Sequence, residues 1–166
     1  DADVMSYMDV DLSTELEALP LLVEGIRSGQ YDLGTGSRLL RESRTTRSAK
    51  REFISRCYNL FLKSILWTSF SDAQCGFKAV SRQVVSEIVP QIKDQAWFFD
   101  SELLVLAEKQ GYRIMDLPVR WIEDDDSRVK IVKTAWEDIK GVFRVRRTLW
   151  GMSLAPKPAT QPVTRR

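Results

Sequence analysis

An apolar run close to the start of the chain reads Val4-Met5-Ser6-Tyr7-Met8 and is followed at once by Asp9-Val10-Asp11. The run predicts a short buried strand that ends at Asp9. Side chains two residues apart in an extended chain point the same way, so Asp9 and Asp11 would face one site together. At the carboxyl end of a strand in an α/β sheet, two carboxylates could bridge Mg²⁺ or Mn²⁺ to a pyrophosphate. Alternatively, the acids only favour the N-terminus of a following helix.

Strands and helices alternate outward from this run. The pattern predicts further strands over 31–36, 77–80 and 113–121, and helices over 14–28, 48–66, 81–89, 101–110 and 130–150. Ser13 or Thr14 would cap the first helix, Ser81 the third and Asp100 the fourth. Pro118 marks the last strand as an edge strand. The alternation predicts an α/β fold whose sheet is covered by helices on both faces.

The helix expected over 48–66 carries Phe53, Cys57, Leu60 and Phe61 at helical spacing. This spacing predicts the apolar face of the helix.

Composition excludes several classes of site. The chain has 166 residues, which fits one domain, and no His, which excludes a Ser-His-Asp or Cys-His engine and a Cys/His zinc site. Two cysteines, Cys57 and Cys75, are too few for a disulfide framework and indicate a reducing compartment. A net charge of +2 does not indicate a nucleic-acid partner.

The charge is distributed unevenly. Residues 38–63 carry eight bases and two acids, whereas residues 123–126 are four consecutive acids. A basic segment could bind phosphates, although solvated helix faces explain most charge runs. The basic helix expected over 130–150 also carries Trp136, Phe143 and Trp150, a composition suited to an anionic membrane surface.

Three further stretches combine side chains that carry chemistry: Gly34-Thr35-Gly36-Ser37-Arg38, Asp72-Ala73-Gln74-Cys75-Gly76-Phe77-Lys78 and Trp97-Phe98-Phe99-Asp100-Ser101-Glu102. In the first, the glycines allow close backbone approach and Arg38 offers a fork for phosphate, unless it is an exposed residue of a tight turn. In the third, Asp100 beside aromatic residues could serve as a base, unless it is only a helix cap.

Together these stretches resemble the family 2 inverting glycosyltransferases, specifically the polyprenyl-phosphate (dolichyl-phosphate) mannosyl- and glucosyltransferases. The resemblance also includes Lys50-Arg51, Tyr58-Asn59 and the segment from Trp121 to Ser127-Arg128, and it extends from residue 4 to about residue 145. It implies a GT-A, Rossmann-like fold with a mixed, mostly parallel sheet. It also implies that residues 1–150 are part of a catalytic domain without its first strands, inactive alone, and that 151–166 form a disordered tail.

The resemblance assigns catalytic and metal-binding roles residue by residue. Asp9 and Asp11 match the aspartates that hold Mg²⁺ or Mn²⁺ and the sugar nucleotide, so Asp11 is also a catalytic residue. Asp100 is at the position of the candidate base. Arg51 matches a basic residue that faces phosphate and is counted with the catalytic residues.

The resemblance also assigns donor- and acceptor-binding residues. Arg38 matches a residue facing phosphates, and Asp72, Gln74 and Lys78 match the loop that lines the sugar and acceptor site. Arg128 matches a residue of the family's mobile loop near the acceptor.

The implied reaction transfers a hexose from a nucleotide-diphosphate sugar to a polyprenyl phosphate with inversion. A phosphomonoester is largely a dianion at neutral pH, so this nucleophile needs no general base. The implied location is the cytoplasmic face of a membrane, with the chain peripheral to it and no nucleic-acid partner. Three alternatives stay open: a catalytically incomplete binding module, a module that mainly binds the membrane surface, and transfer to a sugar hydroxyl.

Overall fold

The computed structural model describes residues 2–122 and 131–151. The strands are β1 (Val4–Met8), β2 (Leu33–Ser37), β3 (Arg44–Thr46), β4 (Phe77–Ser81), β5 (Ile114–Pro118) and β6 (Arg120–Ile122). The helices are α1 (Leu19–Arg27), α2 (Ala49–Leu66), α3 (Arg82–Glu87), α4 (Phe99–Lys109) and α5 (Ile131–Gly151), with 3₁₀ turns η1 (Leu16–Ala18) and η2 (Val89–Gln91). The expectations for Arg128 and for the tail after residue 151 lie outside the described residues.

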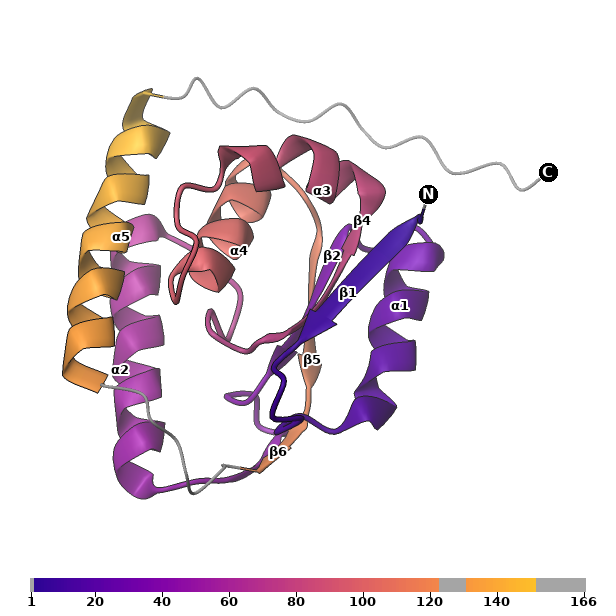
Figure 1. Ribbon diagram of the computed structural model, residues 1–166, viewed down its shortest axis with the longest axis horizontal. Coiled ribbons are helices and arrows are strands. Elements are labelled where there is room, and N and C mark those ends of the chain that lie inside the picture. Colours follow the sequence, from indigo (N-terminus) through magenta and orange to yellow (C-terminus); the bar gives the residue numbers. More distant parts are fainter. Residues whose placement is uncertain (1, 123–130, 152–166) are drawn as a thin grey trace.

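The central sheet has the strand order β1-β4-β2-β5 (Figure 1). β4 pairs antiparallel with both neighbours, and β2 pairs parallel with β5. Strands β1, β2 and β5 therefore run in one direction and only β4 runs against them, which confirms the mixed, mostly parallel sheet. β5 lies at the edge and ends at Pro118, as expected for a strand that contains proline.

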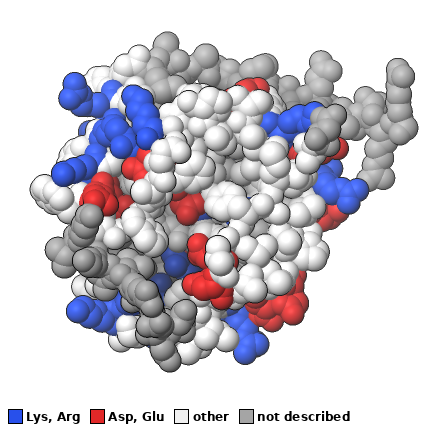
Figure 2. All heavy atoms as spheres, in the orientation of Figure 1, with Lys and Arg blue, Asp and Glu red and all other residues white. Residues whose placement is uncertain are grey.

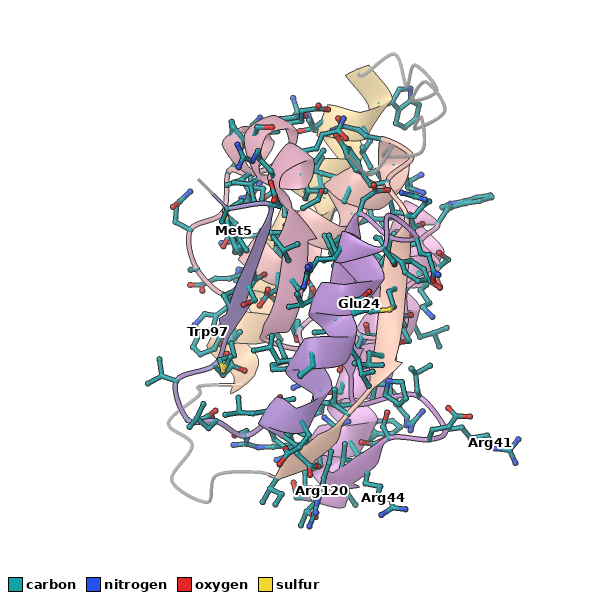
Figure 3. All side chains as sticks on the ribbon, turned by 90° about the vertical axis from the view of Figure 1, so that its right-hand side faces the viewer. Met5, Glu24, Arg41, Arg44, Trp97 and Arg120 are labelled. Atoms are coloured by element: carbon teal, nitrogen blue, oxygen red, sulfur yellow. The ribbon has the colours of Figure 1, made fainter. Side chains whose placement is uncertain are left out.

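A second, two-stranded sheet pairs β3 with β6 in parallel. Arg44 and Arg120 are partners in this register, and Figure 3 shows both at the same end of the molecule. The segment expected as one strand over 113–121 is thus two strands, one in each sheet.

Helices cover both faces of the central sheet, as predicted (Figure 1). α1 packs on one face over a cluster that includes Leu22, Ile26 and Phe77. α2, α3, α4 and α5 lie on the other side around a larger core. Gly34 allows the close approach of α1, because a Cβ there would lie 2.8 Å from a methyl carbon of Leu22. No helix in the described part of the chain is long and apolar enough to cross a bilayer.

Of the expected caps of the first and third helices, Ser81 is confirmed and Ser13 or Thr14 is wrong. Ser48 and Ser81 accept hydrogen bonds from the third residue beyond them and cap α2 and α3. Neither Ser13 nor Thr14 caps α1, because this segment pairs with β6: Thr14 forms a bridge with Trp121, and α1 starts later, with proline in its first turn.

The apolar face predicted for α2 is largely wrong. Phe53 and Leu60 are 69% and 67% exposed, whereas the buried side of the helix contains Asn59, Leu62 and Leu66. That side packs against α5 and the core, so tertiary contacts rather than the hydrophobic spacing decide which face is buried.

Candidate active site

The candidate site begins at the carboxyl end of β1, where Asp9 lies against the loop that precedes β4. The Asp9 amide donates to the Gly76 carbonyl at 2.8 Å. A Cβ at position 76 would lie 2.2 Å from Asp9 Oδ1, so only glycine leaves room for this carboxylate. Desolvation, followed by the Asp11 and Asp100 carboxylates, raises the pKa of Asp9, and Arg38 and Lys78 oppose the shift. Acids and bases from four chain segments therefore share one electrostatic environment.

Asp11 is exposed, and its Oδ1 accepts a hydrogen bond from the Ser13 amide at 3.0 Å. Within residues 2–122 and 131–151, no three acidic or cysteine side chains converge as a complete metal site. Asp9 and Asp11 nevertheless suit Mg²⁺, which is often held by one or two carboxylates and completed by substrate phosphates and water.

Asp100 is held in place by two side chains of the central sheet, Tyr7 on β1 and Lys78 on β4. Its Oδ1 accepts a hydrogen bond from the Tyr7 hydroxyl at 2.5 Å and pairs with Lys78 Nζ at 2.8 Å. The expectation that Asp100 caps its helix is wrong, because α4 begins at Phe99 and Asp100 lies inside its first turn. Asp94 instead accepts from the amides of Ala96 and Phe98 just before α4.

Lys78 is buried and Tyr7 is partly buried beside Asp100. Lys78 is 0% exposed, and its Nζ also donates to the Cys75 carbonyl at 2.5 Å. Burial, together with the Asp100 charge, raises the pKa of Tyr7 far above its ordinary value, so its hydroxyl stays a donor. Burial raises the pKa of the Cys75 thiol to about 11.

Arg38 follows β2 and forms a two-point ion pair with Asp72. Arg38 Nε and Nη2 lie 2.7 and 2.9 Å from the two Asp72 oxygens, and the Arg38 amide also donates to Asp72. Burial opposes ionisation of Asp72, but the guanidinium outweighs it and lowers the pKa of Asp72. The guanidinium also lies over the Trp121 ring, 5.6 Å from its centroid.

Gln74 connects the same loop to α5. Its amide nitrogen donates to Asp138 Oδ2 at 2.7 Å, and Asp138 is 3% exposed. Burial raises the pKa of Asp138 to about 6, and the charges of Asp94 and Glu137 add to the shift. The sequence did not predict Asp138 as a site residue. Its only signal there is that it is an acid on the inner side of a basic helix.

The structure therefore gathers seven expected residues on neighbouring loops and strand ends: Asp9, Asp11, Arg38, Asp72, Gln74, Lys78 and Asp100. Arg51 is instead in the first turn of α2, where its amide donates to Ser48 Oγ. In Figure 2, acidic and basic side chains lie next to one another in a hollow near the middle of the face shown.

Comparison with known proteins identifies glycosyltransferases. No family model matches the chain. It is 38% identical over 156 residues to the glycosyltransferase AglD of Haloferax volcanii, which covers 93% of this chain and 24% of that protein. It is 27% identical over 157 residues to a dolichyl-phosphate β-glucosyltransferase of Trichomonas vaginalis, covering 89% and 47% of the two chains.

A third relative is the dolichyl-phosphate β-glucosyltransferase of Saccharomyces cerevisiae, 29% identical over 101 residues, with 58% of this chain and 30% of the yeast protein covered. The chain thus spans less than half the length of each of these three relatives.

Proposed function

The chain belongs to the family 2 glycosyltransferases, and from this premise we propose that the whole protein transfers a hexose from a nucleoside diphosphate sugar to a polyprenyl phosphate of the dolichyl type. The observation that carries the proposal is the meeting of Asp9, Asp11 and Asp100 with the cations Arg38 and Lys78 at one end of the sheet. Such a mixed cluster suits a diphosphate donor, its metal ion and an anionic acceptor.

The donor diphosphate fits beside the two aspartates that follow β1. Asp9 and Asp11 would hold Mg²⁺ or Mn²⁺, which would neutralise the charge that develops on the leaving diphosphate. Arg38 reinforces this end of the site with a positive charge, although two of its nitrogens already bind Asp72. Because Gly76 has no side chain, the loop before β4 can pack against the Asp9 carboxylate at the edge of this site.

The acceptor needs orientation more than activation. A phosphate oxygen of the lipid attacks the anomeric carbon as the bond from that carbon to the diphosphate breaks, which inverts the carbon. Because a phosphate dianion carries no proton that must be removed, Asp100 has no proton to take. Asp100 instead orients neighbouring groups, in keeping with its fixed position beside Lys78 and Tyr7.

A lipid acceptor lies in a membrane, so the enzyme needs a surface that contacts the membrane. Helices α2 and α5 form a surface suited to that contact. On α2, Phe53 and Leu60 are exposed seven residues apart, and Trp67, the residue that follows the helix, is exposed as well. On α5, Trp136, Phe143 and Trp150 are exposed at seven-residue intervals. Seven residues make about two helical turns, so the exposed residues within each helix lie on one side of it. The two helices are adjacent, with the Phe61 and Phe143 rings 6.4 Å apart (Figure 1).

Basic residues accompany these exposed aromatic side chains: Lys63, Lys140, Arg146 and Arg147. We therefore infer that α2 and α5 rest on an anionic membrane. Two free thiols, Cys57 and Cys75, suit the reducing cytoplasmic face.

The proposal is tested by incubating the full-length protein with a polyprenyl phosphate and a panel of nucleoside diphosphate hexoses. The proposal expects one donor to yield a lipid-linked hexose, dependent on Mg²⁺ or Mn²⁺ and abolished by a chelator. Transfer that continues unchanged in the presence of the chelator would contradict the metal dependence. No transfer with any donor would contradict the proposed function.

A further inference from the structure

Tyr7 and Lys78 are direct partners across the antiparallel ladder between β1 and β4. Cross-strand partners have their side chains on the same face of the sheet. Both side chains reach the start of α4 and meet the same carboxylate oxygen, Asp100 Oδ1, at 2.5 and 2.8 Å. The register of the sheet therefore sets where this carboxylate is held, although Asp100 is 93 residues from Tyr7 in the sequence.

The cation of this cluster is sealed inside the protein. Lys78 is 0% exposed, donates to the Cys75 carbonyl and lies beneath the Tyr7 ring, 5.9 Å from its centroid. An ammonium group without water is costly unless it is paired and hydrogen-bonded, and Asp100 provides the pairing. Lys78 therefore acts on the site through Asp100, with which it pairs, rather than through an exposed surface of its own.

Asp100 reaches solvent, with 23% of its side chain exposed, whereas Lys78 does not. Tyr7 and Lys78 both contact Oδ1 of the carboxylate, and Oδ2 has no hydrogen-bond partner within the described chain. A carboxylate accepts through both oxygens, so fixing one of them orients the other. Tyr7 is itself braced, because its ring packs edge-on against Phe99 at 6.3 Å.

We propose that Tyr7 and Lys78 are positioning residues of the transferase, which fix Asp100 through Oδ1 so that Oδ2 alone faces the reacting groups. This inference rests on the proposed function and adds residues that act only through Asp100. It makes a specific demand: the effect of Tyr7 on turnover must disappear when Asp100 is removed.

The test is a double-mutant cycle on the full-length enzyme, with Tyr7→Phe, Asp100→Ala and the pair of changes. Tyr7→Phe removes one hydroxyl and keeps the ring. We expect kcat to fall about tenfold, since a hydrogen bond to a charged group is lost, with the donor KM changed less than twofold. In the Asp100→Ala background the same change should cost nothing further.

Two controls separate positioning from folding. Tyr112→Phe removes another buried hydroxyl, which donates to Glu87, and should leave kcat unchanged. Lys78→Arg should retain more turnover than Lys78→Met, because it keeps the charge. If Asp100→Ala has no measurable turnover, a crystal structure of Tyr7→Phe decides instead: a rotated Asp100 carboxylate supports the inference and an unmoved one overturns it.

Additive losses in the cycle, an unaffected Tyr7→Phe enzyme or a loss confined to KM would each overturn the positioning role while leaving the transferase assignment intact. A full-length protein with no transfer activity would instead overturn the proposed function, and this inference with it.

Discussion

The guanidinium of Arg38 and the carboxylate of Asp72 meet through two parallel hydrogen bonds, and Asp72 has no exposed surface. The pair connects the end of β2 to the loop before β4, which also carries Gln74 and leads into Lys78. A buried pair of this kind does not prove high stability, but breaking it leaves an uncompensated charge in the interior.

We therefore expect Asp72→Ala to lower the free energy of unfolding by about 3–5 kcal/mol. Urea denaturation of the chain measures the loss. Asp3→Ala is the matched control, because its ion pair with Arg82 is exposed and should contribute no measurable stability. A loss at position 72 no larger than at position 3 would contradict the structural role of the pair.

Asp138 should make stability depend on pH. Its pKa is about 6 in the folded chain against an ordinary value of 3.8, so the folded state binds this proton more tightly. The stabilisation is complete below pH 3.8 and is lost as pH rises through 6. Asp138→Asn lacks this loss, so it should gain up to about 3 kcal/mol over the wild type between pH 4 and 7.

Unfolding free energies of both proteins at a series of pH values test this expectation. A difference between variant and wild type that stays constant over the range would mean that Asp138 has an ordinary pKa.

The metal assignment predicts a contrast between two Asp-x-Asp triplets. Asp11→Asn should abolish transfer and weaken metal-dependent donor binding, because it removes an anionic ligand. Asp3→Asn changes the same residue type in the triplet Asp1-Ala2-Asp3, before β1, and should leave transfer and donor binding unchanged. Titration calorimetry with the nucleotide, with and without Mn²⁺, measures the difference, and equal losses would reject Asp9 and Asp11 as the metal site.

The membrane proposal predicts that the exposed tryptophans just after α2 and at the end of α5 carry lipid binding. Trp67 and Trp150 are 80% and 83% exposed, and Trp67→Ser combined with Trp150→Ser should weaken binding to anionic vesicles at least about tenfold. Trp97→Ser is the control, because Trp97 is exposed on a different segment, before α4 (Figure 3). Equal losses in vesicle sedimentation would contradict a surface formed by α2 and α5.

Local patterns in the sequence were sufficient for features that depend on a few neighbouring residues. They located the strand that ends at Asp9, the cap Ser81 and Pro118 at a sheet edge. They failed where distant segments compete: the residues before α1 pair with β6 instead of capping a helix, and Phe53 and Leu60 face outward.

The contacts within the site show the same limit. β4 enters the sheet between β1 and β2, and only this topology brings Lys78 opposite Tyr7 and beneath Asp100. A short sequence motif does not specify a contact between distant segments, and no motif in the sequence marks Asp138 as a site residue. The resemblance to a family located the loops, but the geometry was needed to decide which side chains pair with one another.

The nature of the acceptor predicts how the enzyme tolerates changes at position 100. Asn keeps an oxygen that accepts from Tyr7 and Lys78, so Asp100→Asn should retain activity within about a hundredfold of the wild type if Asp100 only orients groups. Removing a general base costs about 10²–10⁴-fold, so a loss at the top of that range in steady-state rates would favour a hydroxyl acceptor.

The central claim is tested most directly by offering the full-length enzyme two acceptors of equal chain length, a polyprenyl phosphate and the corresponding polyprenol, with one labelled nucleoside diphosphate hexose. The account predicts a labelled lipid phosphate and no transfer to the alcohol, because the site supplies charge and orientation rather than a base. Transfer to the polyprenol at an equal or greater rate would contradict it.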